Sequence, residues 1–244
     1  MMDIADIHKF YSSPLGRLAQ KYLMRKIIDL WPDVANEIIA GYGYPLPYLD
    51  KYGSQAQQIA VLMPCCQGAS PWPLGGANKV ALTLDDNLPL KDNSIDRLLL
   101  VHAVEHSERP QQLLREAWRI LVDGGAVMII VPNRRGFWAR NPLTPFGGGQ
   151  PYSGRQLYSL VEESFFVPSK PLYALFTPPM YFKAVGALSE TFELVGTSWL
   201  HKIGGVTIIQ AHKQVMAPVL SCSSKAWRSR IFVPTPSPSS KKLF

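Results

Sequence analysis

Residues 88–133 read LPLKDNSIDRLLLVHAVEHSERPQQLLREAWRILVDGGAVMIIVPN, and this stretch decides the fold class. The run 97–102 is short and apolar, which is typical of a strand buried on both faces of a parallel sheet. Residues 107–110 (SERP) indicate a helix start, and apolar residues at helical spacing follow them. We expect the glycines at 124–125 to end that helix and 126–131 to form the next strand. The stretch is therefore half of a doubly wound α/β domain.

The same alternation of strands and helices continues on both sides of this stretch. Further strands are predicted at 37–40, 58–63, 80–84 and 206–211. Helices are predicted from Ser13 to Trp31, where an apolar stripe follows a Ser-Pro start, and from Ser153 to Glu163. This order predicts a Rossmann-like, doubly wound, mostly parallel sheet of seven strands with helices on both faces.

Composition changes along the chain divide it into three parts. We expect an N-terminal amphipathic helix or cap at 1–33, an α/β domain at 34–217, and a disordered Ser/Pro-rich tail at 218–244. The tail contains five basic residues and no acidic one, so five of the seven net positive charges lie there. Since the body is nearly neutral, a dedicated nucleic-acid surface is not expected.

Several classes of protein are excluded by composition. No apolar run reaches the roughly 18 residues of a membrane span, and the first residues have no secretory-signal pattern. The three cysteines lack metal-ligand spacing, so we expect free thiols, a reducing cytoplasmic location and no metal site. A contact of the tail with phosphate or membrane is a less favoured alternative. Nothing in the sequence fixes the oligomeric state.

Three ionisable residues follow the strand at 97–102. His102, Glu105 and His106 lie at the edge of the sheet where doubly wound proteins bind ligands. We expect His102 to line a cofactor pocket, and Glu105 or His106 to face the substrate as a base or hydrogen-bond partner. The alternative is that they are structural.

A second candidate group follows the strand at 126–131. Asn133, Arg134 and Arg135 lie at the same edge. The guanidinium groups of the two arginines are suited to clamping an anionic substrate. The glycine-rich loop after them leads to Tyr152 and is a candidate lid. The alternatives are a surface turn and a long connection.

The motif LPLKDNSID, followed by the segment His102–His106, resembles class I S-adenosylmethionine (SAM)-dependent methyltransferases of the small-molecule type 11 group. The resemblance runs from about residue 31 to about 133. It implies SAM as the cofactor and methyl transfer to a small-molecule acceptor of unidentified nature. It also implies that Gly41, Tyr42 and Gly43, which we expect to form a turn after the first strand, contact the cofactor. Asp85 or Asp86, assisted by Asn87, is then expected to reach the adenine, although a solvated turn is an equal alternative.

The chain departs from this family at three cofactor positions. Ile39 and Pro45 stand where the family has an acid and a glycine, and no carboxylate ends the strand at 58–63. A charge-assisted hydrogen bond contributes roughly 1.5–3 kcal/mol, so these losses matter for SAM affinity. The alternative function is therefore a catalytically degenerate fold that acts as a binding or regulatory module. An NAD-dependent dehydrogenase is set aside because the GxGxxG pattern fails.

Overall fold

A computed structural model describes residues 2–179, 193 and 203–214 of the chain. Within these residues the strands form one sheet in the order β3-β2-β1-β4-β5-β8-β6, with β7 also pairing with β8. Strands β1 to β5 run parallel, and β8 is antiparallel to β5. The strands are β1 (Ile38–Gly43), β2 (Gln58–Pro64), β3 (Val80–Thr83), β4 (Ile95–Val101), β5 (Leu121–Pro132), β6 (Phe166–Pro168), β7 (Leu172–Ala174) and β8 (Val206–Lys213).

The predicted doubly wound, mostly parallel architecture is confirmed. The sheet has eight described strands rather than seven because the segment 166–174 makes two short strands. Pro171 lies between them, and a proline has no N–H to continue a ladder. Both strands pair with β8, which is long enough to take β6 near its end at Lys213 and β7 near its start at Val206.

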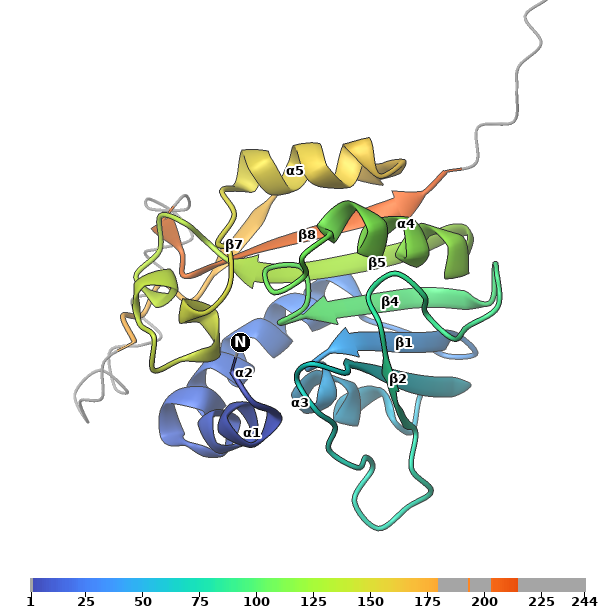
Figure 1. The fold of residues 1–244 in the computed structure, drawn as a ribbon, viewed down its shortest axis with the longest axis horizontal. Coiled ribbons are helices and arrows are strands. Elements are labelled where there is room, and N and C mark those ends of the chain that lie inside the picture. The colour runs from blue at the N-terminus through green and yellow to red at the C-terminus, as the bar shows by residue number, and fades with distance from the viewer. Residues whose placement is uncertain (1, 180–192, 194–202, 215–244) are drawn as a thin grey trace, which may run out of the picture.

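Helices cover both faces of the sheet (Figure 1). Residues of α2 and α3 share one apolar cluster with Ile39 and Met128, whereas residues of α4 and α5 share another with Leu98 and Ile129. Strands β1, β4 and β5 thus contribute side chains to both clusters, which explains their continuous apolar sequences. The helices are α1 (Ile4–Ser12), α2 (Pro14–Leu30), α3 (Leu46–Leu49), α4 (Pro110–Ile120) and α5 (Gly154–Glu163).

The helix starts agree with the sequence in part. Ser13 caps α2 by accepting a hydrogen bond from Gly16 N, and Ser153 caps α5 in a capping box. The first helix, α1, was not predicted. Its start is capped by Asp3, and it is too short for its apolar period to stand out from the helix that follows. None of the described helices has the length and apolar character needed to cross a membrane.

Of the two predictions about α4, the start within 107–110 is confirmed and the end at the glycines is wrong. The helix begins at Pro110 without a side-chain cap, because Ser107 Oγ accepts from Arg109 N instead. It ends at Ile120 rather than at the glycines, since Leu121 is already extended and pairs with Ile95. Gly124 and Gly125 lie inside β5, where Gly124 has a φ of +79° at an irregularity of the β4–β5 ladder. The glycines therefore allow a bulge, not a helix stop.

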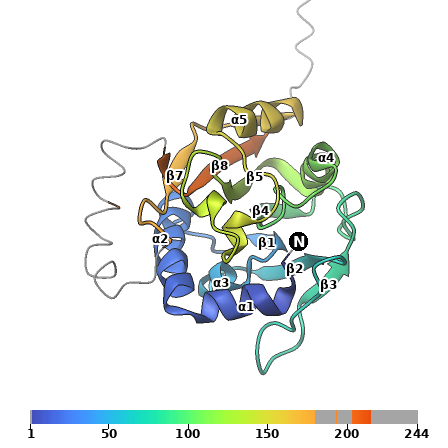
Figure 2. The ribbon, with the colours of Figure 1, turned by 60° about the vertical axis from the view of Figure 1, so that its left-hand side comes forward.

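The carboxyl ends of the parallel strands are covered by two segments that lie far apart in the sequence. Helix α1 and the loop after β5, which contains short helical turns at Trp138–Arg140 and Pro145–Gly147, lie on this side of the sheet (Figure 2). Ile4 N donates to Gln67 O after β2, and Tyr11 contacts His102 after β4. Since seven helical residues rise about 10 Å, α1 crosses the ends of β2, β1 and β4. It closes the edge at which doubly wound folds bind ligands.

Candidate functional site

Gly41, Tyr42 and Gly43 lie in β1, so the predicted turn at these residues is wrong. Their parallel pairing with β2 and β4 continues the strand to Gly43. A Cβ on Gly41 would lie 2.4 Å from Pro45 Cγ, and one on Gly43, whose φ is +91°, would lie 2.2 Å from Val101 O. Both glycines therefore allow neighbouring parts of the protein to close onto β1.

Tyr42 links the end of β1 to the loop after β3. Its side chain is fully buried, and its hydroxyl donates a hydrogen bond to Asp85 Oδ1. Burial, reinforced by the Asp85 carboxylate, raises the pKa of Tyr42 well above its usual range. Of the three residues predicted near the adenine, Asp85 is thus engaged by Tyr42, whereas Asp86 and Asn87 are exposed on the turn.

The segment after β2 contains a site residue that the sequence did not reveal. Cys65 and Cys66 are exposed and form no disulfide, but Gln67 is only 3% exposed. Neither amide atom of the Gln67 side chain has a hydrogen-bond partner among the described residues. Buried amides are nearly always hydrogen-bonded, since desolvating one without compensation costs about 1–3 kcal/mol. Gln67 is therefore a candidate ligand-binding group at the end of β2.

His102 is the centre of a buried polar network at the end of β4. It has a φ of +51°, and its Nε2 lies 2.8 Å from the hydroxyl of Tyr11. The Tyr11 hydroxyl also lies 3.0 Å from that of Tyr48. Burial raises the pKa of both tyrosines, so their hydroxyls stay protonated and available as donors. Sequence spacing gives no signal for this network, because its members come from α1, α3 and the β4–α4 loop.

Glu105 is the least satisfied buried group of the site. Its side chain is fully buried, and Oε1 lies 3.4 Å from His102 Nδ1 without hydrogen-bond geometry. Neither carboxylate oxygen has a hydrogen-bond partner within the described parts of the chain. A buried carboxylate in this state favours a bound hydrogen-bond donor. Two of the residues predicted at this edge, His102 and Glu105, thus lie next to each other.

His106 lies beside Glu105 under the glycine-rich loop. Burial lowers its pKa, an effect that Glu105 opposes, so the imidazole favours its neutral form. Gln150 N donates to Glu105 O at 2.7 Å, and a Cβ on Gly149 would lie 2.9 Å from His106 Nδ1. The loop packs directly on the β4–α4 segment, and its glycine at 149 allows this approach.

Aromatic side chains form the cover above His102. The ring of Phe146, from the glycine-rich loop, has its centroid 4.7 Å from that of His102. Phe146 also contacts Phe10 and Trp138 edge-to-face. Helix α1 and the loop therefore meet over the network and exclude water from it.

The predicted substrate group divides into structural and exposed members. Asn133 is buried, and its Nδ2 donates to Gly204 O at 2.7 Å, so it holds the start of β8. Arg134 and Arg135 have exposed side chains on the turn that follows. Tyr152 is buried and pairs with Asn133 through a backbone bridge, and burial, together with Glu105, raises its pKa.

No cluster of three or more His, Cys, Asp or Glu side chains suited to a metal ion occurs in the described part of the molecule.

Comparison with known proteins finds a family match for part of the chain. Residues 37–129 match the family model described as a methyltransferase domain, and this segment runs from the start of β1 into β5. The resemblance to the type 11 methyltransferase group, seen in the sequence, is thereby confirmed for this segment. Among curated proteins, no sequence matches this chain.

Solved structures show the same fold. A SAM-dependent methyltransferase from Thermotoga maritima aligns with a TM-score of 0.61 at 16% identity, over 86% of this chain and 96% of that chain. The methyltransferase in a complex with the Haloferax volcanii Trm112 methyltransferase activator gives 0.58 at 12%, over 88% and 100%. A SAM-dependent methyltransferase from Archaeoglobus fulgidus gives 0.57 at 15%, over 84% and 96%. At these identities the likeness establishes the fold and not the acceptor.

Proposed function

We propose that this chain is a SAM-dependent methyltransferase that transfers a methyl group to a small-molecule acceptor. The observation that carries the proposal is the set of buried, unpartnered polar groups at the ligand edge. Gln67 and Glu105 lie after β2 and β4, on the covered side of the sheet, and the matched methyltransferase segment includes both. A ligand with hydroxyl and amino groups would form hydrogen bonds with these atoms. Without such a ligand, their burial lowers the stability of the fold.

The residues present fit SAM, although they differ from the residues that bind it in the family. In the family an acid after the second strand binds the ribose hydroxyls; here the Gln67 amide would take that part. Glu105, with His102, would hold the amino group of the methionine part or a donor on the acceptor. Bound SAM supplies a methyl group on a positively charged sulfur. The protein then has to align the acceptor and exclude water, which the aromatic cover of Phe10 and Phe146 favours.

The enclosed ligand edge also supports a small-molecule acceptor. Helix α1 and the loop containing Phe146 lie across the strand ends, which favours a small acceptor over a macromolecular one. Cys65 and Cys66 are exposed and form no disulfide, which suits the reducing cytoplasm, where we place the protein.

Titration calorimetry of the full chain with SAM and with S-adenosylhomocysteine tests the cofactor. We expect micromolar affinity for both, and we expect Gln67→Leu to weaken binding about tenfold, because one or two hydrogen bonds are lost. Gln58→Leu is the matched control, since Gln58 is an exposed glutamine at the opposite end of the same strand. Equal affinities of the two variants would remove Gln67 from the site.

The alternative function has its own supporting observation. Ile39, at the position of the family's acid, is fully buried in the apolar core, and Asp85 is engaged by Tyr42. These features fit a methyltransferase fold that has become a binding or regulatory module. If calorimetry detects no heat of binding with millimolar SAM, while circular dichroism shows a folded protein, this alternative would be established and the assignment as an enzyme would be wrong.

The catalytic assignment is tested by replacing the three residues of the β4–α4 segment. We expect His102→Asn, Glu105→Gln and His106→Asn to lower transfer of labelled methyl from SAM into a small-metabolite extract by about 100-fold or more. His212→Asn is the control, because His212 lies near the end of β8 and contacts Gly124 O. If activity survives all three changes, the assignment is wrong.

A further inference from the structure

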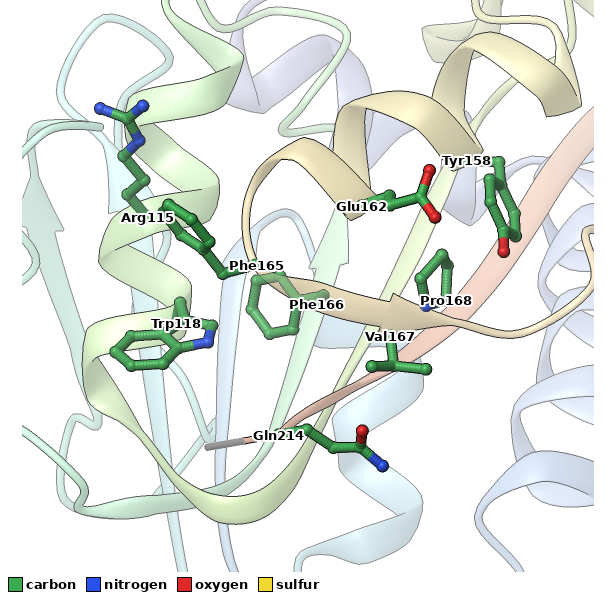
Figure 3. A pocket seen from close by; sticks show the side chains of 9 residues that line it. All are labelled: Arg115, Trp118, Tyr158, Glu162, Phe165, Phe166, Val167, Pro168 and Gln214. Atoms are coloured by element: carbon green, nitrogen blue, oxygen red, sulfur yellow. The ribbon is translucent and has the colours of Figure 1, made fainter. Parts of the chain in front are cut away.

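An apolar groove lies on the α4–α5 face of the molecule, away from the ligand edge. Its volume is about 870 Å³, and α4, α5, β6 and Gln214 line it (Figure 3). Phe165 and Val167 leave 65% and 47% of their surface exposed there. Exposed apolar side chains that gather in one concave surface usually mark a binding site. This groove is independent of the proposed methyltransferase activity.

Two features of the groove indicate that something covers it. Phe165, just after α5, has a φ of +69°, a conformation that is uncommon for an aromatic residue, and this backbone presents its ring outward. The indole nitrogen of Trp118 is buried and has no hydrogen-bond partner among the described residues. In Figure 3 this nitrogen points toward the side on which Phe166 and Gln214 lie. An occupant with apolar side chains and a backbone carbonyl would satisfy both features.

The chain itself supplies such an occupant at the edge of the groove. Strand β8 ends at Lys213, which pairs with Phe166 of β6, and Gln214 already lines the groove. The next residues, 215–220, read VMAPVL and are uncharged and apolar, unlike the Ser- and Lys-rich sequence beyond them. Six extended residues reach about 20 Å, which is enough to cross from a strand to a neighbouring helix.

We propose that residues 215–220 of this chain bind in the groove between α4, α5 and β6, with a backbone carbonyl accepting from Trp118 Nε1. Charge favours a course toward α5. Glu162 and Glu163 are exposed at the end of that helix, whereas α4 presents Arg115. The tail continues with Lys225, Arg228 and Arg230, which the glutamates attract and Arg115 repels. The α/β domain then extends to about residue 220, and the polar tail begins after it.

Hydrogen–deuterium exchange of the full chain tests this placement. We expect the combined change Met216→Asp, Val219→Asp and Leu220→Asp to speed exchange at 115–118 and 165–168 roughly tenfold or more, because the loss of even one buried aliphatic side chain shifts local opening by about that factor. The matched control adds the same charges further along the tail, as Ser237→Asp, Ser239→Asp and Ser240→Asp, and should leave both segments unchanged.

Two outcomes would overturn the proposal. One is equal exchange in the two variants and the unchanged chain, which would mean that an external ligand or partner uses the groove. The other is protection that rises with protein concentration together with dimers in sedimentation velocity, which would mean that a second copy covers it. Circular dichroism melts of both variants separate loss of this contact from loss of the fold.

Discussion

Replacing Trp138 with alanine is expected to lower the free energy of unfolding by about 3–5 kcal/mol. Trp138 is 1% exposed, and its rings pack edge-to-face with Phe10 and Phe146. Its Nε1 also donates to Thr177 O at 2.7 Å. The change therefore leaves a cavity and removes a hydrogen bond at one place. Since domains of this kind have a stability of about 5–15 kcal/mol, the loss is a large fraction of the total.

Urea unfolding followed by circular dichroism measures this loss, and the neighbouring residue provides the control. Phe137 is 53% exposed, so Phe137→Ala should change stability by less than about 1 kcal/mol. Trp138→Phe should fall between the two, because it keeps an aromatic ring but not the donor. Similar losses at 137 and 138 would show that the aromatic cover over the ligand edge contributes little to the fold.

The architecture was predictable from the sequence because its central strands are buried on both faces and are therefore composed mostly of apolar residues. Residues 97–101 are buried apart from Arg97, and 126–131 are buried throughout, so both read as apolar runs whatever packs on them. The capping signals of α2 and α5 are likewise local, since Ser13 and Ser153 bind amides within three residues. The starts of these two helices were therefore predicted correctly.

Predictions were wrong where contacts between distant parts of the chain determine the local backbone structure. Gly41 and Gly43 are typical of a ligand-binding turn, but Gly41 pairs with both neighbouring strands and Gly43 pairs with β4, so the strand continues through them. Gly124 and Gly125 are typical of a helix stop, but pairing of Leu121 with Ile95 ends the helix earlier. A glycine permits unusual conformations without specifying one, so its sequence context alone leaves several possibilities open.

The candidate site shows the same division. His102, Glu105 and His106 were identifiable because they follow a buried strand directly. Tyr11 and Gln67 were not, since one enters the site from α1 and the other is a neutral side chain in an irregular loop. The site thus combines a segment that is recognisable in sequence with groups that only the fold brings to it.

The alkaline limit of stability is the second large expected effect. Six buried tyrosines among the described residues have a raised pKa, with burial as the first cause, and for Tyr44 and Tyr52 the pKa rises to about 12. They are Tyr11, Tyr42, Tyr44, Tyr48, Tyr52 and Tyr152. Unfolded tyrosines lose their proton near pH 10, whereas these keep it in the folded chain. Between pH 10 and 12 the unfolded state therefore binds fewer protons, and stability falls as pH rises.

We expect the chain to unfold in one cooperative step between pH 10 and 12. Each such tyrosine removes up to about 1.4 kcal/mol of stability per pH unit, so several together exceed the stability of an ordinary domain within this window. Phenolate absorbance at 295 nm and far-ultraviolet circular dichroism should change at the same pH. Tyr11→Phe should make the transition shallower, whereas Tyr158→Phe, at the half-buried tyrosine of α5, should not. Gradual ionisation with unchanged dichroism would mean that solvent reaches the His102 network, and α1 would then cover the ligand edge only part of the time.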